Sequence, residues 1–417
     1  MDSKKKSSGA PKPEKQSKCK YSERCGGCVY MDKEYRVQLE IKQKTVEKLM
    51  KPFGSVLPIV GMEEPYHYRN KVHAVISGGR KGEIYAGTYE AGTHRVVDVE
   101  NCMIDNEEAD AIIRTVAGLM RSFKFVPYNE DTGRGFLRHI LVRTARATGQ
   151  IMVVLVVADK VFPSKNNFVK ALLKAHPSIT TIVSNFNDRR TSMVLGEREQ
   201  VLYGRGCIED ELCGCRFKLS PRSFYQINPV QTEILYRLAV EYAGLTGAES
   251  VIDAYSGIGT IGIIASKYAG SVTGVELNAD AVKDAAVNLR LNNCKNANYI
   301  QGDAGEFMLR EAAAGRSCDV VFMDPPRGGS SREFLEALAR LSPKKVIYIS
   351  CNPETLAADL KYLTKKGYKM DKCRPVDMFP WTGSIETIVL LSHKSSDSHI
   401  NVRTEFGEGK VMFRWLQ

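Results

Sequence analysis

The sequence has little that would place the protein in a membrane or outside the cell. No stretch approaches the roughly 18 continuous apolar residues that a membrane-spanning helix needs. The N-terminal stretch MDSKKKSSGAPKPEKQSK also lacks the apolar run of a secretory signal peptide. No internal repeat is evident. We therefore expect a cytoplasmic protein of two or three folded domains with no membrane partner.

Acidic residues are too few to balance the basic ones. The 417 residues include 59 Lys and Arg against 48 Asp and Glu, which gives a net charge of +11. Residues 1–18 are rich in Lys, Ser and Pro, and we expect them to form a disordered basic tail. This balance favours a polyanionic partner, nucleic acid first. A solubilising surface is the other interpretation.

The protein has eleven cysteines, but disulfides rarely form in the cytoplasm, where we expect it. Metal binding, catalysis or plain burial are therefore the expected uses of these cysteines. Cys19, Cys25 and Cys28 have the spacing C-x5-C-x2-C. This spacing predicts a metal site that still needs a fourth ligand, with zinc and iron–sulfur as alternatives. No site is expected at six others that lack such a context: Cys207, Cys213, Cys215, Cys294, Cys318 and Cys373.

The order of the patterns divides the chain into five segments. The basic tail (1–18) precedes a cysteine knot followed by a helix (19–55). Runs rich in β-branched residues, such as KVHAVIS and GQIMVVLVV, are interrupted by two helical patches and predict an α+β domain over 56–215. Strands alternate with helices over 216–393, which predicts an α/β domain with a parallel, doubly wound sheet. A second tail occupies 394–417.

A Gly-rich stretch, VIDAYSGIGTIG, lies between a buried-type strand and a helix. Gly257 and Gly259 allow a tight turn and the close approach of a ligand to the backbone. Glu276 ends the next strand, where an acid can hold ribose hydroxyls, and Asp303 ends the following one, where it could hold an adenine amine. The pattern predicts a nucleotide-type cofactor; a βα turn that merely needs glycine is the alternative. The Walker pattern GxxxxGK[ST] is absent from this turn.

A proline-rich loop, MDPPRGG, follows a later strand, and its two prolines fix Asp324 at the strand end. Loops of this form resemble those of S-adenosylmethionine (SAM) methyltransferases. Taken together, five ordered motifs closely resemble the RNA (uracil-5-)-methyltransferase family of bacterial ribosomal and transfer RNA enzymes, over about residues 19 to 393. The motifs are SFYQIN (223–228), DAYSGIGT (253–260), DPPRGG (324–329), SCNP (350–353) and SIETIVLL (384–391).

The resemblance implies a covalent mechanism. A thiolate that adds to C6 of uracil makes C5 nucleophilic enough to take a methyl group, and a base then removes the C5 proton. Cys351 is implied as the nucleophile and Glu386 as the general base, with a structural ion pair as the alternative for Glu386. Many family members have histidine where this chain has Ser384. The residues implied to bind SAM are Gln226 (alternatively a capping side chain), Tyr255, Gly257, Gly259, Thr260, Glu276, Asp303 and Asp324, the last also holding uracil.

The same resemblance bears on the metal and the substrate. The ribosomal RNA branch carries a [4Fe–4S] cluster on this cysteine pattern, which implies Cys102 as the fourth ligand. It favours 23S rRNA as the substrate, with transfer RNA as the alternative. A non-catalytic iron–sulfur protein that binds RNA is a rival of another class. No obligate protein partner is indicated.

The RNA is expected to lie on the middle domain. The segments YHYRNK (66–71) and RGFLRHILVR (134–143) mix basic and aromatic groups, which can hold phosphates and unpaired bases. Strand edges protected by charge are the alternative. Many relatives have an added N-terminal RNA-binding β-barrel, whereas the tail that precedes the cysteines here is too short for one.

Overall fold

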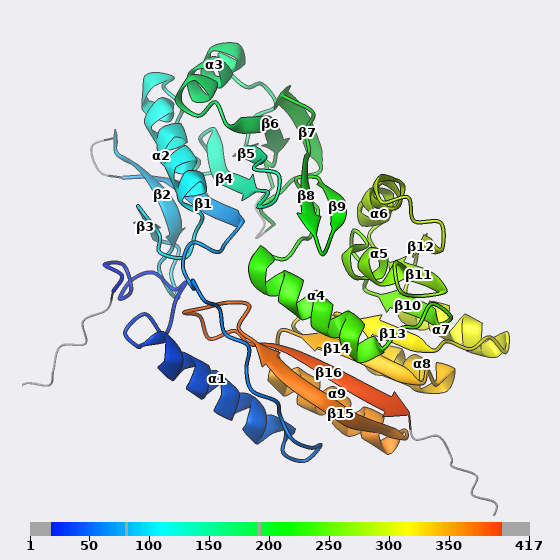
Figure 1. Cartoon of the computed structure of the whole chain (residues 1–417). Helices are drawn as coiled ribbons and strands as arrows, with labels where there is room; N and C mark the ends of the chain where they lie inside the picture. Colours follow the sequence, from blue (N-terminus) through cyan, green and yellow to red (C-terminus); the bar gives the residue numbers. More distant parts are fainter. Residues whose placement is uncertain (1–17, 80–81, 190–192, 394–417) are drawn as a thin grey trace, which may run out of the picture.

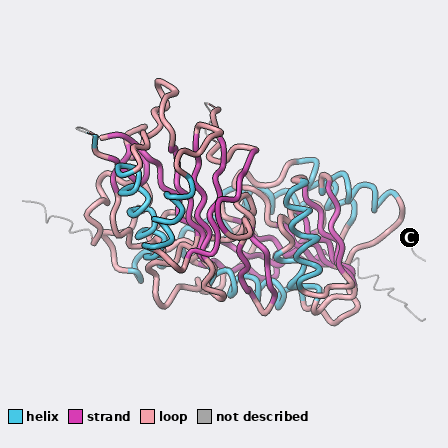
Figure 2. Tube along the Cα trace, turned by 90° about the horizontal axis from the view of Figure 1, so that it is seen from above, coloured by secondary structure: helices cyan, strands magenta, loops and turns pink. Residues whose placement is uncertain are grey.

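The computed structural model describes residues 18–79, 82–189 and 193–393 (Figure 1). The two predicted tails lie outside these residues, apart from Lys18. Within the described ranges, no helix is long and apolar enough to cross a membrane. The strands form two seven-stranded sheets and a two-stranded hairpin. Figure 2 shows the two large sheets as two separate groups of strands with helices alongside each.

The first sheet occupies the middle of the chain, in the order β3-β2-β1-β4-β5-β6-β7. Strands β5 and β6 pair in parallel, and the other neighbours are antiparallel. All seven residues of β5, IMVVLVV, are buried, because both faces of the sheet centre are covered. Its elements are β1 (Lys71–Gly78), β2 (Ile84–Tyr89), β3 (Val96–Asp98), α2 (Glu107–Ser122), β4 (Leu137–Thr144), β5 (Ile151–Val157), α3 (Lys165–Ala175), β6 (Ile179–Phe186) and β7 (Arg198–Tyr203).

Helices α2 and α3 pack on one face of this sheet through a shared apolar core. Asn106 caps α2 by accepting a hydrogen bond from the Ala109 N–H, and three acids in the first turn favour the same helix end. The runs KVHAVIS and GQIMVVLVV correctly predicted β1 and β5, and the similar runs EIYAGTY, RHILVRTA and TTIVSNFN predicted β2, β4 and β6. They missed β7, whose residues are mostly exposed, so that no apolar face marks it in the sequence.

A hairpin and a helix connect the two sheets. Strands β8 (Ile208–Leu212) and β9 (Cys215–Leu219) pair around a tight turn at Gly214, whose φ of +68° suits glycine. The chain then passes through the segment that contains SFYQIN into α4 (Pro229–Ala243), which Asn228 caps and Pro229 begins. Hairpin and helix share one core with both sheets.

The second sheet has the order β12-β11-β10-β13-β14-β16-β15. Its first five strands are parallel, and β16 and β15 are antiparallel to their neighbours. The predicted doubly wound α/β sheet is therefore confirmed. Its elements are β10 (Ser250–Ala254), α5 (Thr260–Ser266), β11 (Ser271–Glu276), α6 (Ala279–Leu291), β12 (Ala297–Gln301), α7 (Ala304–Ala313), β13 (Val320–Met323), α8 (Arg332–Leu341), β14 (Lys345–Ser350), α9 (Pro353–Lys365), β15 (Tyr368–Val376) and β16 (Glu386–His393).

Helices cover both faces of this sheet because its strand residues alternate between two cores. Val251 packs with α4 and α5, whereas the next residue, Ile252, packs with α7, α8 and α9. Helix α1 (Tyr35–Met50) adds Val46 and Met50 to the second core. The N-terminal helix thus belongs to the C-terminal sheet, and it lies beside α9 in Figure 1.

A buried ion pair fixes α1 to the segment between β15 and β16. The Lys42 Nζ lies 2.6 Å from Asp377 Oδ1, both side chains are fully buried, and Lys42 also donates to the Phe379 carbonyl at 3.0 Å. Tyr35 donates its hydroxyl to the other oxygen of Asp377 at 2.8 Å. Trp381 accepts hydrogen bonds from the backbone N–H groups of residues 29 and 30. The cysteine-bearing segment and α1 are therefore bound to the same loop.

Candidate active site

One cavity of about 460 Å³ lies at the strand ends of the second sheet and collects most of the predicted site. Eight of the ten predicted catalytic and cofactor residues line it: Gln226, Tyr255, Gly257, Thr260, Glu276, Asp324, Cys351 and Glu386. Gly259 and Asp303 do not line it.

The three reactive side chains come from neighbouring strands. Asp324 follows β13, and Cys351 follows β14. Glu386 begins β16, where Thr387 pairs with Ser350 in the antiparallel register, so Glu386 and Cys351 lie next to each other at one sheet edge. Ligands of open α/β sheets bind at the carboxyl ends of the parallel strands. The thiol, the two carboxyls and the Gly-rich turn therefore lie together at the sheet edge where this fold binds a ligand.

The Gly-rich turn has the strained geometry that its residues predict. Tyr255, Gly257 and Gly259 have φ values of 61°, 55° and 87°. The Gly257 N–H donates to Glu276 Oε2 at 2.9 Å, which joins the turn to the end of β11. At Gly259 a Cβ would lie 2.7 Å from the Tyr299 ring, so this glycine makes room for Tyr299 rather than for a ligand.

Asp303 serves a helix in this structure. It is the N-cap of α7, and its Oδ1 accepts a hydrogen bond from the Glu306 N–H at 3.0 Å. A carboxylate at this helix end is stabilised both by the N–H groups and by the helix dipole. Its predicted contact with adenine therefore stays a prediction.

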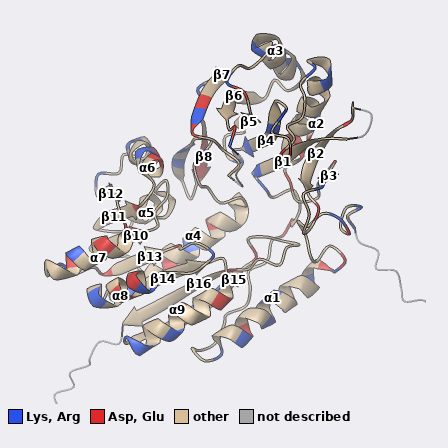
Figure 3. Cartoon of the chain, turned by 180° about the vertical axis from the view of Figure 1, so that it is seen from behind, with Lys and Arg blue, Asp and Glu red and all other residues tan. Residues whose placement is uncertain are grey.

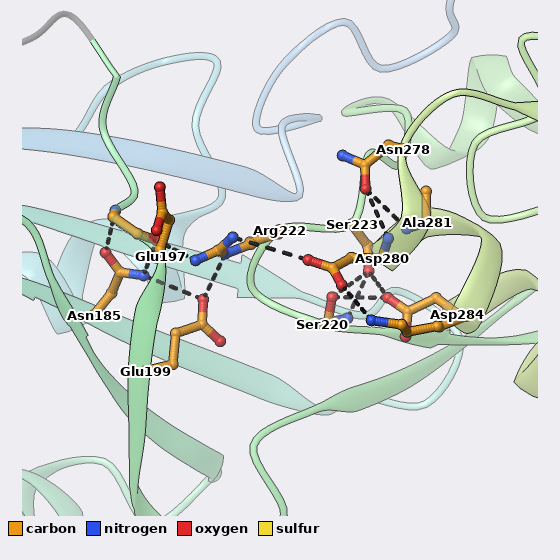
Figure 4. Close-up of polar contacts among 12 residues, drawn as sticks. Asn185, Glu197, Glu199, Ser220, Arg222, Ser223, Asn278, Asp280, Ala281 and Asp284 are labelled. Carbon is orange, nitrogen blue, oxygen red and sulfur yellow. Dashed lines mark hydrogen bonds and ion pairs between the residues drawn. The ribbon is translucent and has the colours of Figure 1, made fainter. Parts of the chain in front are cut away.

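The SFYQIN segment is held between the two sheets. Arg222 binds Glu199 of β7 and Asp280 of α6, at 3.3 and 4.0 Å (Figure 4). Ser220 and Ser223 both donate to Asp284 Oδ2, at 2.8 and 2.9 Å. These contacts fix the backbone just before Gln226, whose Nε2 lies 3.5 Å from Asp324 Oδ2.

The electrostatics of the cavity favour neutral acids. Burial raises the pKa of Asp324 to about 7, against the opposing hydrogen bond from Gln226. Burial, and then the neighbouring Asp324, raise the pKa of Glu386 well above its usual value; its side chain is only 2% exposed. Two buried carboxyls this close cannot both carry a full charge easily. Glu386 has no cation partner in the described ranges, so the structural ion pair is wrong.

The Cys351 thiol is also held in its neutral form. Burial, followed by the Glu386 and Asp324 carboxyls, raises its pKa to about 11, and the cation of Arg327 only partly opposes this. A positive charge brought into the cavity would favour the ionised forms of the thiol and both carboxyls. The arrangement is suited to a cationic ligand such as a sulfonium.

Four residues that line the catalytic cavity were not predicted as site residues. Phe224 and Arg327 stand inside the quoted motifs, which carried their signal but gave them no role. Tyr236 of α4, whose hydroxyl lies 3.4 Å from Thr260 Oγ1, follows the helical apolar pattern and reads as core. Phe379 lies between β15 and β16, and only the tertiary structure brings it here.

A second cavity, of about 260 Å³, is lined by Cys19, Cys25, Cys28 and Cys102. The four predicted ligands thus come together from segments more than seventy residues apart. In residues 18–79, 82–189 and 193–393, no group of three or more His, Cys, Asp or Glu side chains is placed to hold a metal ion.

Comparisons with known proteins show the family to which the chain belongs. The model of the family described as tRNA (uracil-5-)-methyltransferase matches residues 34–394. An uncharacterized RNA methyltransferase of Halalkalibacterium halodurans is 42% identical over 382 residues, which cover 90% of this chain and 83% of the relative. One of Caldanaerobacter subterraneus is 40% identical over 377 residues, covering 89% and 83%.

A solved structure is similar over most of the chain. The Pyrococcus abyssi tRNA (uracil-54, C5)-methyltransferase, in complex with S-adenosyl-L-homocysteine, superposes with a TM-score of 0.73 at 27% identity. The match covers 88% of this chain and 86% of that one.

Proposed function

Since this chain belongs to the tRNA (uracil-5-)-methyltransferase family, and is thus a SAM-dependent RNA methyltransferase, we propose that it methylates C5 of a uridine in 23S rRNA. The observation that carries the chemistry is the single cavity where Cys351, Glu386 and Asp324 meet the Gly-rich turn. A non-catalytic RNA-binding protein does not fit this family.

The proposed reaction uses a thiol and a carboxyl in sequence. Cys351 releases its proton to solvent when the cationic donor is bound, and its thiolate adds to C6 of uracil. Electron density moves to C5, which takes the methyl group as the bond between that group and the sulfonium of SAM breaks. Glu386 then accepts the C5 proton, and the bond between sulfur and C6 breaks as the double bond re-forms. The raised pKa of Glu386 suits it to accept a proton. The target base must leave its stack to reach this cavity.

Asp324 and Gln226 are proposed to orient the two substrates. The Gln226 amide donates to the Asp324 carboxyl at 3.5 Å, so the pair presents an amide and a carboxyl to the cavity. The N3–H and carbonyl groups of uracil, or the ammonium of SAM, match these donors and acceptors. Glu276 and Tyr255 are proposed to hold the adenosine part, and Asp303 to approach the adenine amine.

The second cavity is proposed to hold a [4Fe–4S] cluster on Cys19, Cys25, Cys28 and Cys102. Four thiols without another ligand type are the donor set of such a cluster. The four thiols line one cavity of about 260 Å³, which leaves room among them for a bound group. This group would tie the N-terminal segment to the segment before α2.

The cluster is expected to give a visible signature. Protein purified without oxygen should be brown and absorb in the visible range, and Cys102→Ser should weaken or abolish that absorption. Cys207→Ser, a matched change outside the cavity, should leave it intact. Colourless protein with one zinc per chain would contradict the assignment.

The identity of the RNA can be tested directly. Mass-spectrometric nucleoside mapping of a deletion strain should show the loss of 5-methyluridine from 23S rRNA, restored by the wild-type gene but not by the Cys351→Ala gene. Transfer RNA is the second candidate, because the similar solved structure is an enzyme that acts on tRNA. Loss of 5-methyluridine from tRNA alone would replace the first candidate by the second.

A further inference from the structure

One face of the first sheet carries four basic side chains that we call the cationic strip: Lys71 and His73 of β1, and His139 and Arg143 of β4. Lys71 stands directly opposite Arg143 in the antiparallel register, and the rings of His73 and His139 are 4.9 Å apart. Their neighbours Val72 and Val142 belong to the core under α2 and α3. Since side chains alternate across a strand, the strip lies on the opposite face.

The strip lacks a counter-charge within the described part of the chain. Neither Lys71 nor Arg143 has a carboxylate partner there, and the guanidinium of Arg143 donates to one backbone carbonyl, that of Ser223, at 2.7 Å. Its Nε has no hydrogen-bond partner, although the side chain is only 1% exposed. Like charges directly opposite on paired strands are destabilising, and an unpaired buried cation is more so.

The pKa values of the strip agree with this lack of counter-charge. Burial, and then the charge of Arg143, lower the pKa of Lys71 to about 8, and burial lowers that of Arg143 to about 10. Burial, and then the charge of Lys71, lower the pKa of His73 to about 4, although the residue is exposed to solvent. The outer helices, by contrast, mix both signs of charge (Figure 3). A bound anion would offset the repulsion between these basic side chains.

The strip adjoins the catalytic cavity. Asn70, next to Lys71, donates its backbone N–H to the Ile227 carbonyl at 2.9 Å and its side chain to the Gln226 carbonyl at 3.1 Å. Arg143 holds the same SFYQIN segment at Ser223. Phe224 of this segment is 67% exposed and lines the catalytic cavity. A ligand at the strip therefore lies one short segment away from the reacting base.

The cysteine cavity offers a competing anion, because Lys71 and His73 also line it. Arg69 is the cation whose charge acts on Cys25 and Cys28, and it lies 3.9 Å from Asp105 in the same wall. The charge that lowers the pKa of Lys71 is that of Arg143, which stands opposite it on β4. Arg69 thus serves the cysteines, and Lys71 is left for another anion.

We propose that the cationic strip binds an RNA phosphate next to the target uridine, with Lys71 and His73 touching the phosphate oxygens and Arg143 and His139 behind them. This inference rests on the proposed RNA methyltransferase function. Lys71 supplies a charge, and the neutral imidazole of His73 donates a hydrogen bond. Fixing this phosphate would hold the backbone while the base enters the catalytic cavity.

The test measures binding of the RNA fragment around the mapped uridine at several salt concentrations. Lys71→Gln should weaken binding about tenfold and reduce the slope of log K against log[salt] by roughly 0.7–0.9, the loss of one phosphate contact. Lys174→Gln on α3, across the sheet, should change neither. SAM affinity should be the same in all three proteins.

A second arm locates the phosphate. Fragments with one neutral methylphosphonate on either side of the uridine should bind wild type about tenfold more weakly at one position, with no further loss in Lys71→Gln. Two results would refute the strip as a phosphate site. One is an unchanged salt slope in Lys71→Gln, and the other is a methylphosphonate that weakens binding to Lys71→Gln as much as it weakens binding to wild type. A Lys71→Gln protein with an altered visible spectrum but unchanged RNA binding would also refute it, because Lys71 would then interact with the cluster. Wild type that methylates no uridine would instead refute the proposed function.

Discussion

Replacing Cys351 by alanine is expected to abolish methyl transfer to uridine, lowering the single-turnover rate by at least about 10⁴-fold, as removal of a covalent nucleophile does. Without the sulfur no adduct forms at C6, and C5 of uracil stays too weak a nucleophile for SAM. The remaining cavity is intact, so SAM binding, measured by calorimetry, should change little.

The matched variants separate chemistry from folding. Glu386→Gln should still form the adduct but fail to lose the C5 proton, and should therefore accumulate a protein–RNA complex that survives denaturing electrophoresis. Cys207→Ala, which lies outside both cavities, should be fully active. A Cys351→Ala protein that methylates RNA at the wild-type rate would overturn the covalent mechanism.

Replacing Lys42 by alanine is expected to lower the free energy of unfolding by about 3–5 kcal/mol, because it leaves the Asp377 carboxylate buried without its cation. Thermal unfolding should report this loss. Activity should fall more than stability explains, since Lys42 also holds the Phe379 carbonyl in the loop that reaches the catalytic cavity.

Two variants control for this effect. Lys44→Ala, exposed on the same helix, should change the free energy of unfolding by less than about 0.5 kcal/mol. The double variant Lys42→Met, Asp377→Asn removes both charges and should recover part of the stability. A Lys42→Ala protein as stable as the wild type would show that the buried pair makes no net contribution.

The sequence predicted the second sheet well because each strand and helix there has a local pattern. β13 is four buried residues followed by Asp-Pro-Pro, and Cys351 comes directly after β14, so the site residues were expected at strand ends. Asp303 shows a limit of this reasoning, since its position at a strand end also makes it the N-cap of the next helix.

Residues that act at long range gave no usable signal. Lys42 lies in a helix with a charged pattern, and a lysine there is expected in solvent; its partner is 335 positions away. Phe379 and Tyr236 enter the catalytic cavity only through packing between distant segments. The cationic strip arises from the register of β1 against β4, which no pattern within either strand records.

The raised pKa of Cys351 has a consequence for the resting protein. Oxidants and alkylating agents react with thiolates far faster than with thiols, and a thiol with a pKa of about 11 offers very little thiolate at neutral pH. Burial, together with the two carboxyls beside it, would thus slow the reaction of this thiol with such agents between turnovers. The thiolate would form when a cationic methyl donor occupies the cavity, so the free enzyme would be slow to react with oxidants and alkylating agents.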